Sequence, residues 1–362
     1  MTEQHRIEAR KREHAEIAIT DAVETRHRAQ WDDLTLIPDA VPGVSPDDVY
    51  TSVNFLGREL SAPIVIAGMT GGHEAARKMN EVLAAAAQQL GLAIGCGSQR
   101  AALVDPRLVD TYAVVRDVAP DAVVIANIGA SQLVDQGEHR ALDEAAIREI
   151  VNMVGADFLA VHLNAREELV QVEGDRRLAW LPALANAVRV SPVPVIAKET
   201  GAGIARESAE ALSSAGVAAL DVGGAGGTNF ALVEAARAEA MGSRLHVRLG
   251  TTFADWGIST AVSILEARGA GVPLIATGGI RTGLDGAKAL ALGATMIGIG
   301  RPALLAAGEG FEALVAELET FLEELRIAIT LCGCSRLDEL SQRIVVHGTV
   351  REWVVARGLD EQ

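Results

Sequence analysis

The sequence has 362 residues, of which 49% are hydrophobic and 36 are glycine, so it is long enough to bury one large core. Its formal net charge of −16 argues against a nucleic-acid surface, because proteins that bind nucleic acids present basic patches to phosphate. The 3 cysteines do not make a disulfide framework. No apolar run reaches the ~18 residues that a membrane span requires. We therefore expect a cytoplasmic protein without a signal segment and without a nucleic-acid or membrane partner.

Three consecutive regions are expected to build a single domain. Residues 1–60 are predicted to form an N-terminal arm and cap, and their charged stretch EARKREHAEIAI (8–19) is typical of a solvated amphipathic helix. Residues 61–309 are predicted to form a barrel core. Residues 310–362 are predicted to form C-terminal helices that complete the barrel.

Eight short apolar runs recur through the core region. Each is a nearly continuous series of small and branched residues, as expected for strands that are buried on both faces. Alanine-rich helical patterns separate most of them, which favours a closed (β/α)8 TIM barrel over an open doubly wound sheet. The predicted strands are 63–68, 92–97, 122–127, 157–163, 193–198, 217–222, 272–277 and 294–299, and the predicted helices are 76–90, 107–118, 141–153, 179–189, 205–215, 229–241, 258–268 and 284–292.

Polar or glycine residues follow every predicted strand, where barrels of this kind place their chemistry. A single histidine or asparagine in such a position is usually a structural polar group, whereas eight such strand ends together indicate a binding site. The residues concerned are 69–72, 97–100, Asn127, His162 with Asn164, Lys198 with Glu199, 223–228, 278–283 and 298–301.

The last two of these turns favour a phosphate site. GGIRTGLD (278–285) and GIGR (298–301) have glycines that let backbone N–H groups approach an anion, with Arg281 as a counter-charge and Thr282 as a helix cap. An ordinary strand-to-helix turn can have the same glycines. The matching turn after the next strand favours phosphate.

A flavin is the phosphorylated ligand that the neighbouring strand ends favour. Lys198 and Asn127 suit its polar edge, because a fixed ammonium stabilises the anionic reduced ring. A Schiff base, or an ion pair between Lys198 and Glu199, is the alternative reading of this lysine. No dinucleotide fingerprint follows any strand, so FMN is favoured over FAD or a nicotinamide cofactor.

Several longer motifs, taken together, resemble one family. RKREH, MTGG, GSQRAAL, ANIGASQL, HLN followed by EGDR, KETGAG, GAGGT, FADWG and GGIRTGLDGAKALALGA occur in the order typical of type 2 isopentenyl diphosphate isomerases. The resemblance runs from about residue 8 to the C-terminal VREWVVARGLD. It implies FMN that is active in its reduced form, Mg²⁺, NADPH as the reductant, and a homo-oligomer, either a tetramer or an octamer.

The resemblance also implies roles for individual residues. Arg10, Lys11, Ser98 and Arg100 are expected to bind the substrate diphosphate, with His14 close by. The residues expected around FMN are Gly68, Met69, Thr70, Ser98, Asn127, Lys198, Gly223, Thr228, Gly279, Ile280, Arg281, Gly300 and Arg301.

The segment after the fourth predicted strand departs from the family pattern, which is His-Leu-Asn-x-x-Gln-Glu. The same places hold His162, Asn164, Glu167 and Glu168, so Glu168 keeps the metal role and Glu167 replaces the glutamine at the reacting end of the substrate. Unlike an amide, a carboxyl group can be charged at neutral pH. Burial and Glu168 would favour its neutral form, whereas Mg²⁺ and a charged His162 would favour the carboxylate.

Two functions are compatible with this departure. The first is interconversion of isopentenyl and dimethylallyl diphosphate with His162, Asn164 and Glu167 as catalytic residues, for which Glu167→Gln is expected to keep or improve turnover. The alternative is a divergent FMN-dependent oxidoreductase or isomerase that acts on another prenyl or phosphorylated substrate. Phe253 and Trp256, on the loop 251–257, are expected to form either a lid or local core.

Overall fold

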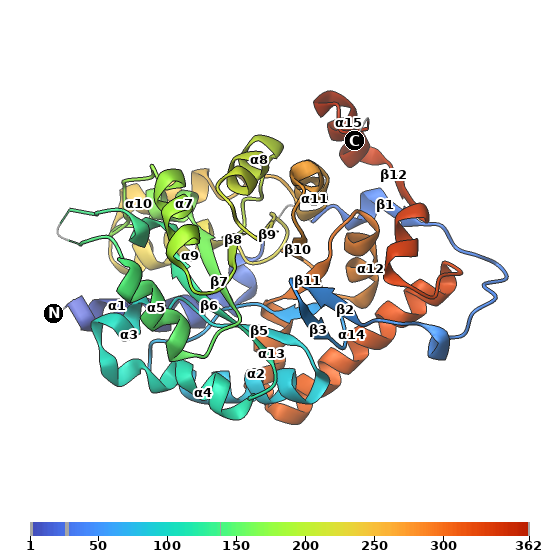
Figure 1. The fold of residues 1–362 in the computed structure, drawn as a ribbon. Coiled ribbons are helices and arrows are strands. Elements are labelled where there is room, and N and C mark those ends of the chain that lie inside the picture. Colours follow the sequence, from blue (N-terminus) through green and yellow to red (C-terminus); the bar gives the residue numbers. More distant parts are fainter. Residues whose placement is uncertain (1–2, 26–28, 138, 361–362) are drawn as a thin grey trace.

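The computed structural model describes residues 3–25, 29–137 and 139–360. At its centre, eight parallel strands close into a barrel in the order β10-β11-β4-β5-β6-β7-β8-β9 (Figure 1). The predicted (β/α)8 barrel and all eight predicted strands are confirmed. The strands are β4 (Ile64–Ile66), β5 (Ala93–Gly95), β6 (Val123–Gly129), β7 (Phe158–Leu163), β8 (Val195–Glu199), β9 (Ala219–Asp221), β10 (Leu274–Thr277) and β11 (Met296–Ile299).

Helices surround the barrel. Both ends of each predicted helix lie within about three residues of the ends of an observed helix. They are α2 (Ala76–Leu90), α4 (Asp110–Val118), α5 (Glu144–Met153), α7 (Leu181–Val190), α8 (Arg206–Ser214), α9 (Phe230–Ala240), α11 (Thr260–Ala267), α12 (Gly283–Ala291) and α13 (Arg301–Glu309).

Four helices were not predicted: α13, and in addition α3 (Arg100–Val104), α6 (Ala165–Val170) and α10 (Arg244–Thr252). In α10, Gly250 and two threonines weaken the local helical preference. Packing against α9 explains the helix, because a Cβ atom at Gly250 would lie 2.5 Å from the carbonyl oxygen of Ala231. The prediction that residues 251–257 are all loop is therefore wrong at its first two positions.

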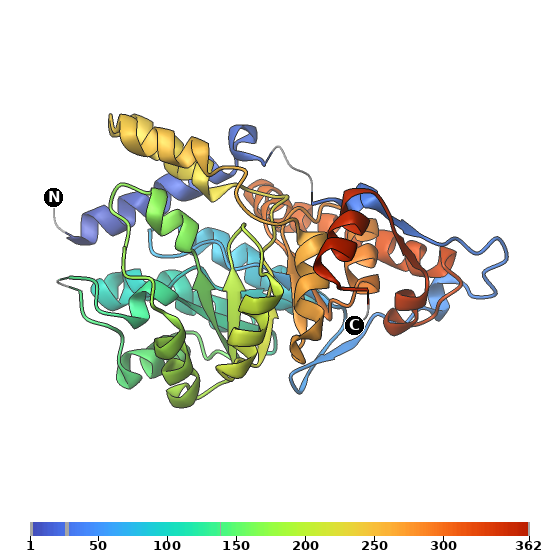
Figure 2. The same ribbon diagram turned by 90° about the horizontal axis from the view of Figure 1, so that it is seen from above.

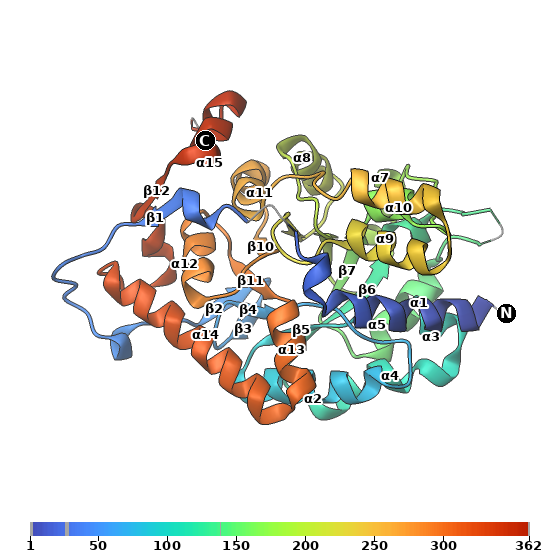
Figure 3. The ribbon, with the colours of Figure 1, turned by 180° about the vertical axis from the view of Figure 1, so that it is seen from behind.

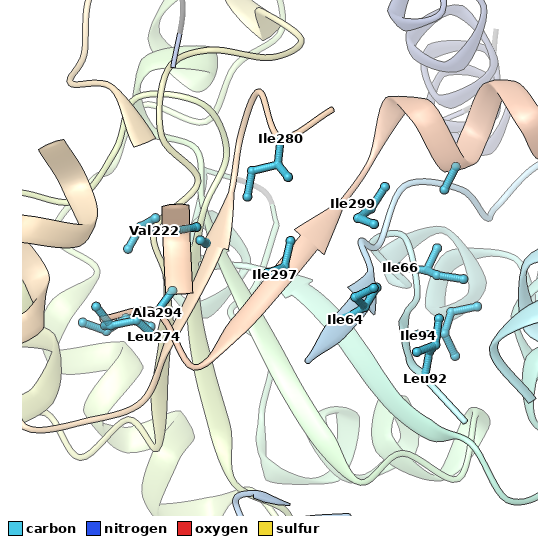
Figure 4. Packing of buried hydrophobic residues seen from close by; sticks show 14 of the residues in the cluster. Ile64, Ile66, Leu92, Ile94, Val222, Leu274, Ile280, Ala294, Ile297 and Ile299 are labelled. Atoms are coloured by element: carbon cyan, nitrogen blue, oxygen red, sulfur yellow. The ribbon is translucent and has the colours of Figure 1, made fainter. Parts of the chain in front are cut away.

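The barrel interior is packed at its N-terminal end and open at the other. The hairpin of β2 (Val53–Phe55) and β3 (Arg58–Leu60) packs there with the inward side chains, and Phe55 meets Phe158 edge-to-face at 5.6 Å. Outward side chains such as Ile64, Ile94 and Ile297 belong to the layer between strands and helices (Figure 4). This leaves the C-terminal strand ends to line a site.

The terminal segments pack on the outside of the barrel. β1 (Leu34–Leu36) pairs with β12 (Ile344–Val346), α14 (Phe311–Leu331) packs on α2, α12 and α13, and α15 (Gly348–Arg357) packs on α11. The N-terminal helix α1 (Glu3–Ala18) crosses the barrel in contact with α3 and α9 (Figure 3). In Figure 2 this blue helix lies on the same side as the yellow helices α9 and α10.

Two expectations from composition can be compared with the described residues. All three cysteines are free and buried, and burial raises the pKa of the Cys96 thiol to about 12, so these thiols serve packing. Across the described part of the chain, no helix combines the length and the apolar character that crossing a bilayer needs.

Candidate active site

One cavity of about 760 Å³ opens at the C-terminal ends of the barrel strands. It is lined by every residue that was expected to act in catalysis or to bind substrate, cofactor or metal, from Arg10 on α1 to Arg301 at the start of α13. Its volume lies within the roughly 300–1,000 Å³ typical of cofactor and ligand sites. Residues that are almost 300 positions apart in the chain therefore share one pocket.

Two arginines after β10 and β11 already hold an anion in this cavity. The Glu24 carboxylate oxygen Oε1 accepts hydrogen bonds from Arg301 at 2.6 Å and from Arg281 at 3.3 Å. Glu24 is fixed in place by a backbone bridge to Thr228. The contact shows that both guanidinium groups can converge on one acidic group, as phosphate binding requires.

The turns around these arginines leave room for a phosphate group. Thr282 begins α12 with a capping box to Asp285, as predicted for this threonine. A Cβ atom at Gly300 would approach nothing closer than the Met69 sulfur at 3.7 Å. The cavity is thus open beside Gly300, whereas the backbone N–H groups of Arg281 and Thr282 already donate to Asp285.

Lys198 lies where β8 ends, two strands from β10 in the barrel order. Its ammonium pairs with the Asp221 carboxylate on β9 at 2.7 Å. The alternative of an ion pair between Lys198 and Glu199 is therefore wrong. Glu199 instead accepts hydrogen bonds from the backbone N–H groups of residues 201–203 at 2.6–3.0 Å.

Two other positions assigned to FMN are already engaged by the protein. The Thr70 hydroxyl donates to Asn80 on α2. Gly223 has a φ of +45°, and a Cβ atom there would lie 2.0 Å from the Glu199 carbonyl oxygen, so no larger residue fits. The Thr70 hydroxyl therefore has its proton engaged, and Gly223 can offer a ligand only its backbone.

His162 lies at the end of β7 and is neutral. Burial, followed by the charge of Lys198, lowers its pKa to about 3. Its Nδ1 lies 2.8 Å from the Asn127 side-chain oxygen, which can only accept, so the proton is on Nδ1. The lowered pKa of His162 thus favours its neutral form over the charged form considered from the sequence.

Glu168 is buried at the centre of a network of donors. Its two oxygens accept from the Asn164 amide at 2.9 Å, from the backbone N–H of Asp175 at 2.8 Å, and from the Gln171 amide. Burial raises the pKa of Glu168.

Two buried amide oxygens lie in the same cavity, Oδ1 of Asn164 and Oε1 of Gln132, and neither has a hydrogen-bond partner in the described part of the chain. Carboxylate and amide oxygens are the ligands that Mg²⁺ prefers. Within residues 3–25, 29–137 and 139–360, no group of three or more His, Cys, Asp or Glu side chains is arranged to hold a metal. The donor set therefore fits an ion that takes its other ligands from water and phosphate.

Glu167 is buried beside Arg166, which the sequence patterns had not singled out. The Arg166 guanidinium donates to Oε1 of Glu167 at 2.7 and 3.1 Å, and the Thr200 hydroxyl lies 3.3 Å from Oε2. Burial, followed by the Glu167 charge, raises the pKa of the nearby Glu199 to about 8. In the sequence, the only signal for this pair is an arginine next to the glutamate that replaces the family's glutamine.

The N-terminal arm brings further cations into the cavity. The Lys11 ammonium donates to the backbone oxygens of Gly71 and Ser98 and to the Tyr112 hydroxyl at 2.7 Å. Burial, together with the charge of Arg10, lowers the pKa of Lys11 to about 7.

Ion pairs fasten the same arm to α9. His14 lies 2.6 Å from Glu234, and Arg237 binds Glu13 at 3.0 Å. From the barrel side, Arg100 faces the cavity and pairs loosely with Asp175 at 3.5 Å. The arm thus places Lys11 and His14 within reach of the same space as Arg100.

The aromatic pair after α10 is neither lid nor core. Phe253 and Trp256 contact each other at 6.2 Å, are 39% and 65% exposed, and do not line the cavity. The loop contributes the Trp256 backbone oxygen, which accepts a hydrogen bond from Arg166 at 2.9 Å.

Comparison with known proteins first defines the class of protein to which the chain belongs. The model of the family described as FMN-dependent dehydrogenase matches residues 4–105 and 116–347. Among solved structures, a lactate oxidase of Pediococcus acidilactici superposes with a TM-score of 0.64 at 16% identity, covering 94% of each chain. A mandelate oxidase bound to (S)-2-phenylpropionate has a TM-score of 0.61 at 18% identity, covering 93% of this chain and 96% of the other. At this identity, the structures show a shared fold alone.

Curated relatives then identify the family within this class of protein. Isopentenyl-diphosphate delta-isomerases of Methanothrix thermoacetophila and Methanococcoides burtonii are 46% and 44% identical, each covering 97% of this chain and 96% of the relative. That of Halobacterium salinarum is 44% identical over 98% of both chains. The chain therefore belongs to the type 2 isopentenyl-diphosphate delta-isomerase family, within the FMN-dependent barrel proteins.

Proposed function

We propose that this protein interconverts isopentenyl diphosphate and dimethylallyl diphosphate, with reduced FMN, Mg²⁺ and NADPH as the source of reducing equivalents. The observation that carries the proposal is a pair of cationic clusters in one cavity. Arg281 and Arg301 follow β10 and β11, whereas Lys11 and Arg100 meet beyond β5. A cofactor phosphate and a substrate diphosphate each need such a cluster, because the net charge of −16 repels anions elsewhere.

The cavity residues divide into three groups in this proposal. Arg281 and Arg301 hold the FMN phosphate, and Lys198 and Asn127 hold the polar edge of the ring. Lys11, Arg100 and the neighbouring Arg10 hold the substrate diphosphate, with Glu168 and the unpaired oxygen of Asn164 for Mg²⁺. His162 and Glu167 line the space between these groups.

When bound, reduced FMN would supply a proton carrier for this reaction. The protein's own residues bind, orient and exclude water around the prenyl chain, whose double bond moves when one carbon gains a proton and another loses one. The neutral His162 adds no positive charge beside a carbocation-like species. The docked arm keeps water out, which such a reactive species requires.

A divergent FMN-dependent activity on another prenyl or phosphorylated substrate is the second candidate. The observation that favours it is Glu167, an acid at the position of an amide. Product analysis decides between the two: FMN-loaded, reduced protein with Mg²⁺ is expected to convert isopentenyl diphosphate to dimethylallyl diphosphate. Absence of that product from flavin-loaded protein would favour the second candidate.

Glu24 is expected to compete with the FMN phosphate for Arg281 and Arg301. Replacing Glu24 by glutamine removes the competing charge, so FMN should bind up to about tenfold more tightly, equivalent to about 1.4 kcal/mol. Flavin fluorescence titration of the FMN-free protein measures the change. Glu16→Gln is the matched control, because Glu16 pairs only loosely with Arg12 on the exposed side of α1, at 3.8 Å. Weaker FMN binding in Glu24→Gln would contradict the competition.

Lys11 is expected to make substrate affinity depend on pH. Its lowered pKa of about 7 means that the ammonium is charged below pH 7 and is lost as the pH rises through 7. The KM for isopentenyl diphosphate should therefore rise by about tenfold for each pH unit above 7, until the pH reaches the pKa of Lys11 in the substrate-bound protein. Lys11→Arg keeps its charge and should give a flat profile. A wild-type KM that does not change between pH 7 and 9 would contradict a role for Lys11 in binding.

A further inference from the structure

Arg166 and Glu167 are sequence neighbours whose side chains are turned toward each other. Both are buried, with 5% and 6% of their side-chain surface exposed. Adjacent positions on a helix point in different directions, so this contact is not a by-product of α6. Two N–H groups of one guanidinium converge instead on a single oxygen of Glu167.

The rest of the Arg166 guanidinium is also fixed. Its Nη1 donates to the Trp256 backbone oxygen at 2.9 Å, and its Nη2 lies so close to Gly201 that a Cβ atom there would approach it to 3.3 Å. The loop after α10 and the turn after β8 therefore determine where Arg166 lies. Through Arg166 they also determine where Glu167 points within the cavity.

The pairing matters because a buried charge is tolerated only when it is compensated. The neighbouring acids Glu168 and Glu199 line the same cavity and provide no positive charge. Arg166 is the cation in hydrogen-bond contact with Glu167. Together the two side chains carry no net charge.

We propose that Arg166 is the positioning residue for Glu167, and that the pair acts as one neutral unit in the place where the family has a neutral glutamine. The inference rests on the proposed isomerase function. It reverses the expectation from the sequence that Glu167→Gln alone would keep or improve turnover. That substitution would leave Arg166 as an unpaired cation beside the reacting end of the substrate.

The two single substitutions should each be harmful, whereas the double substitution restores neutrality. Glu167→Gln leaves a guanidinium next to developing positive charge, and Arg166→Met leaves a carboxylate free to turn toward Mg²⁺ or the substrate. We expect each single variant to lower kcat by roughly a hundredfold, because small displacements at a reacting centre have effects of that size. The kcat of the double variant should return to within about tenfold of wild type, since the effects of substituting two residues in contact are not additive.

A thermal unfolding cycle on the FMN-free protein tests the pairing independently of activity. Each single variant should lower Tm by roughly 5 °C or more, and the double variant should lie above both. Arg148→Met is the matched control, because Arg148 and Glu144 form an exposed pair, 51% and 58% accessible, and its Tm should change by less than about 2 °C.

The outcomes separate this inference from the proposed function. A double variant with Tm and kcat above those of Glu167→Gln supports the neutral unit, and this comparison holds even if Arg166→Met alone does not fold. If the losses of Tm and kcat in the double variant equal the sums of the losses in the two single variants, the neutral unit is overturned. Wild-type protein that makes no dimethylallyl diphosphate would reject the isomerase function, while the unfolding cycle still decides whether Arg166 and Glu167 are coupled.

Discussion

Removal of residues 1–14 is expected to raise the KM for isopentenyl diphosphate by about a thousandfold while leaving the Kd for FMN within about threefold of wild type. The deletion takes away Arg10, Lys11 and His14, and losing two or three charge-assisted contacts of about 1.5–3 kcal/mol accounts for an effect of this size. The FMN contacts that we propose come from the barrel itself, from Lys198, Arg281 and Arg301, so they should persist.

The control for this deletion is Arg12→Gln on the same helix. Arg12 is 63% exposed and faces Glu16 rather than the cavity, so the KM of Arg12→Gln should match that of wild type. Equal losses of FMN and substrate affinity in the deletion variant would contradict a separate role for the arm, because they would mean that α1 supports the whole barrel mouth. Steady-state kinetics and flavin titration on the same preparation distinguish the two results.

Replacement of Glu168 by glutamine is expected to lower kcat/KM by at least about a hundredfold and to abolish the response to Mg²⁺. Even an outer partner of a metal ligand typically contributes about 10–100-fold, so the carboxylate itself should contribute no less. The amide keeps the shape of Glu168 but loses the charge that would hold the ion in the proposed site. Activity measured across a Mg²⁺ titration checks the prediction.

Glu173→Gln is the comparison for this substitution. Glu173 is 40% exposed and pairs with Arg237 rather than with the buried network. It should keep the wild-type Mg²⁺ dependence. A Glu168→Gln variant with an unchanged Mg²⁺ titration would show that the ion is held elsewhere.

The sequence predicted the barrel because its strands are buried on both faces and therefore appear as apolar runs with polar ends. It also predicted the cavity residues that follow the strands, since parallel strands bring their C-terminal ends together whatever their distance in the chain. Arg10, Lys11 and His14 on α1 were indicated only by the family resemblance, and Glu24 and Gln132 were not predicted. The helix α10 was missed because its stability comes from contact with α9 rather than from local preference. Gly250, unfavourable in an isolated helix, is needed there for close packing.

Side-chain pairings were not predictable from the sequence. The alternative reading paired Lys198 with its neighbour Glu199, yet Lys198 pairs with Asp221 on the adjacent strand, since adjacent residues on a strand point to opposite faces. Glu24 and Arg301 meet although 277 positions separate them. The neutral state of His162 likewise depends on burial, which only the assembled cavity creates.

The most direct test of the central claim, that the barrel mouth is a flavin phosphate site, is the visible absorption spectrum of the purified protein after incubation with FMN and removal of unbound ligand. We expect a yellow protein with about one flavin per chain, bleached by dithionite, and loss of the bound flavin in Arg301→Met. A colourless wild-type protein that retains no FMN would contradict the claim.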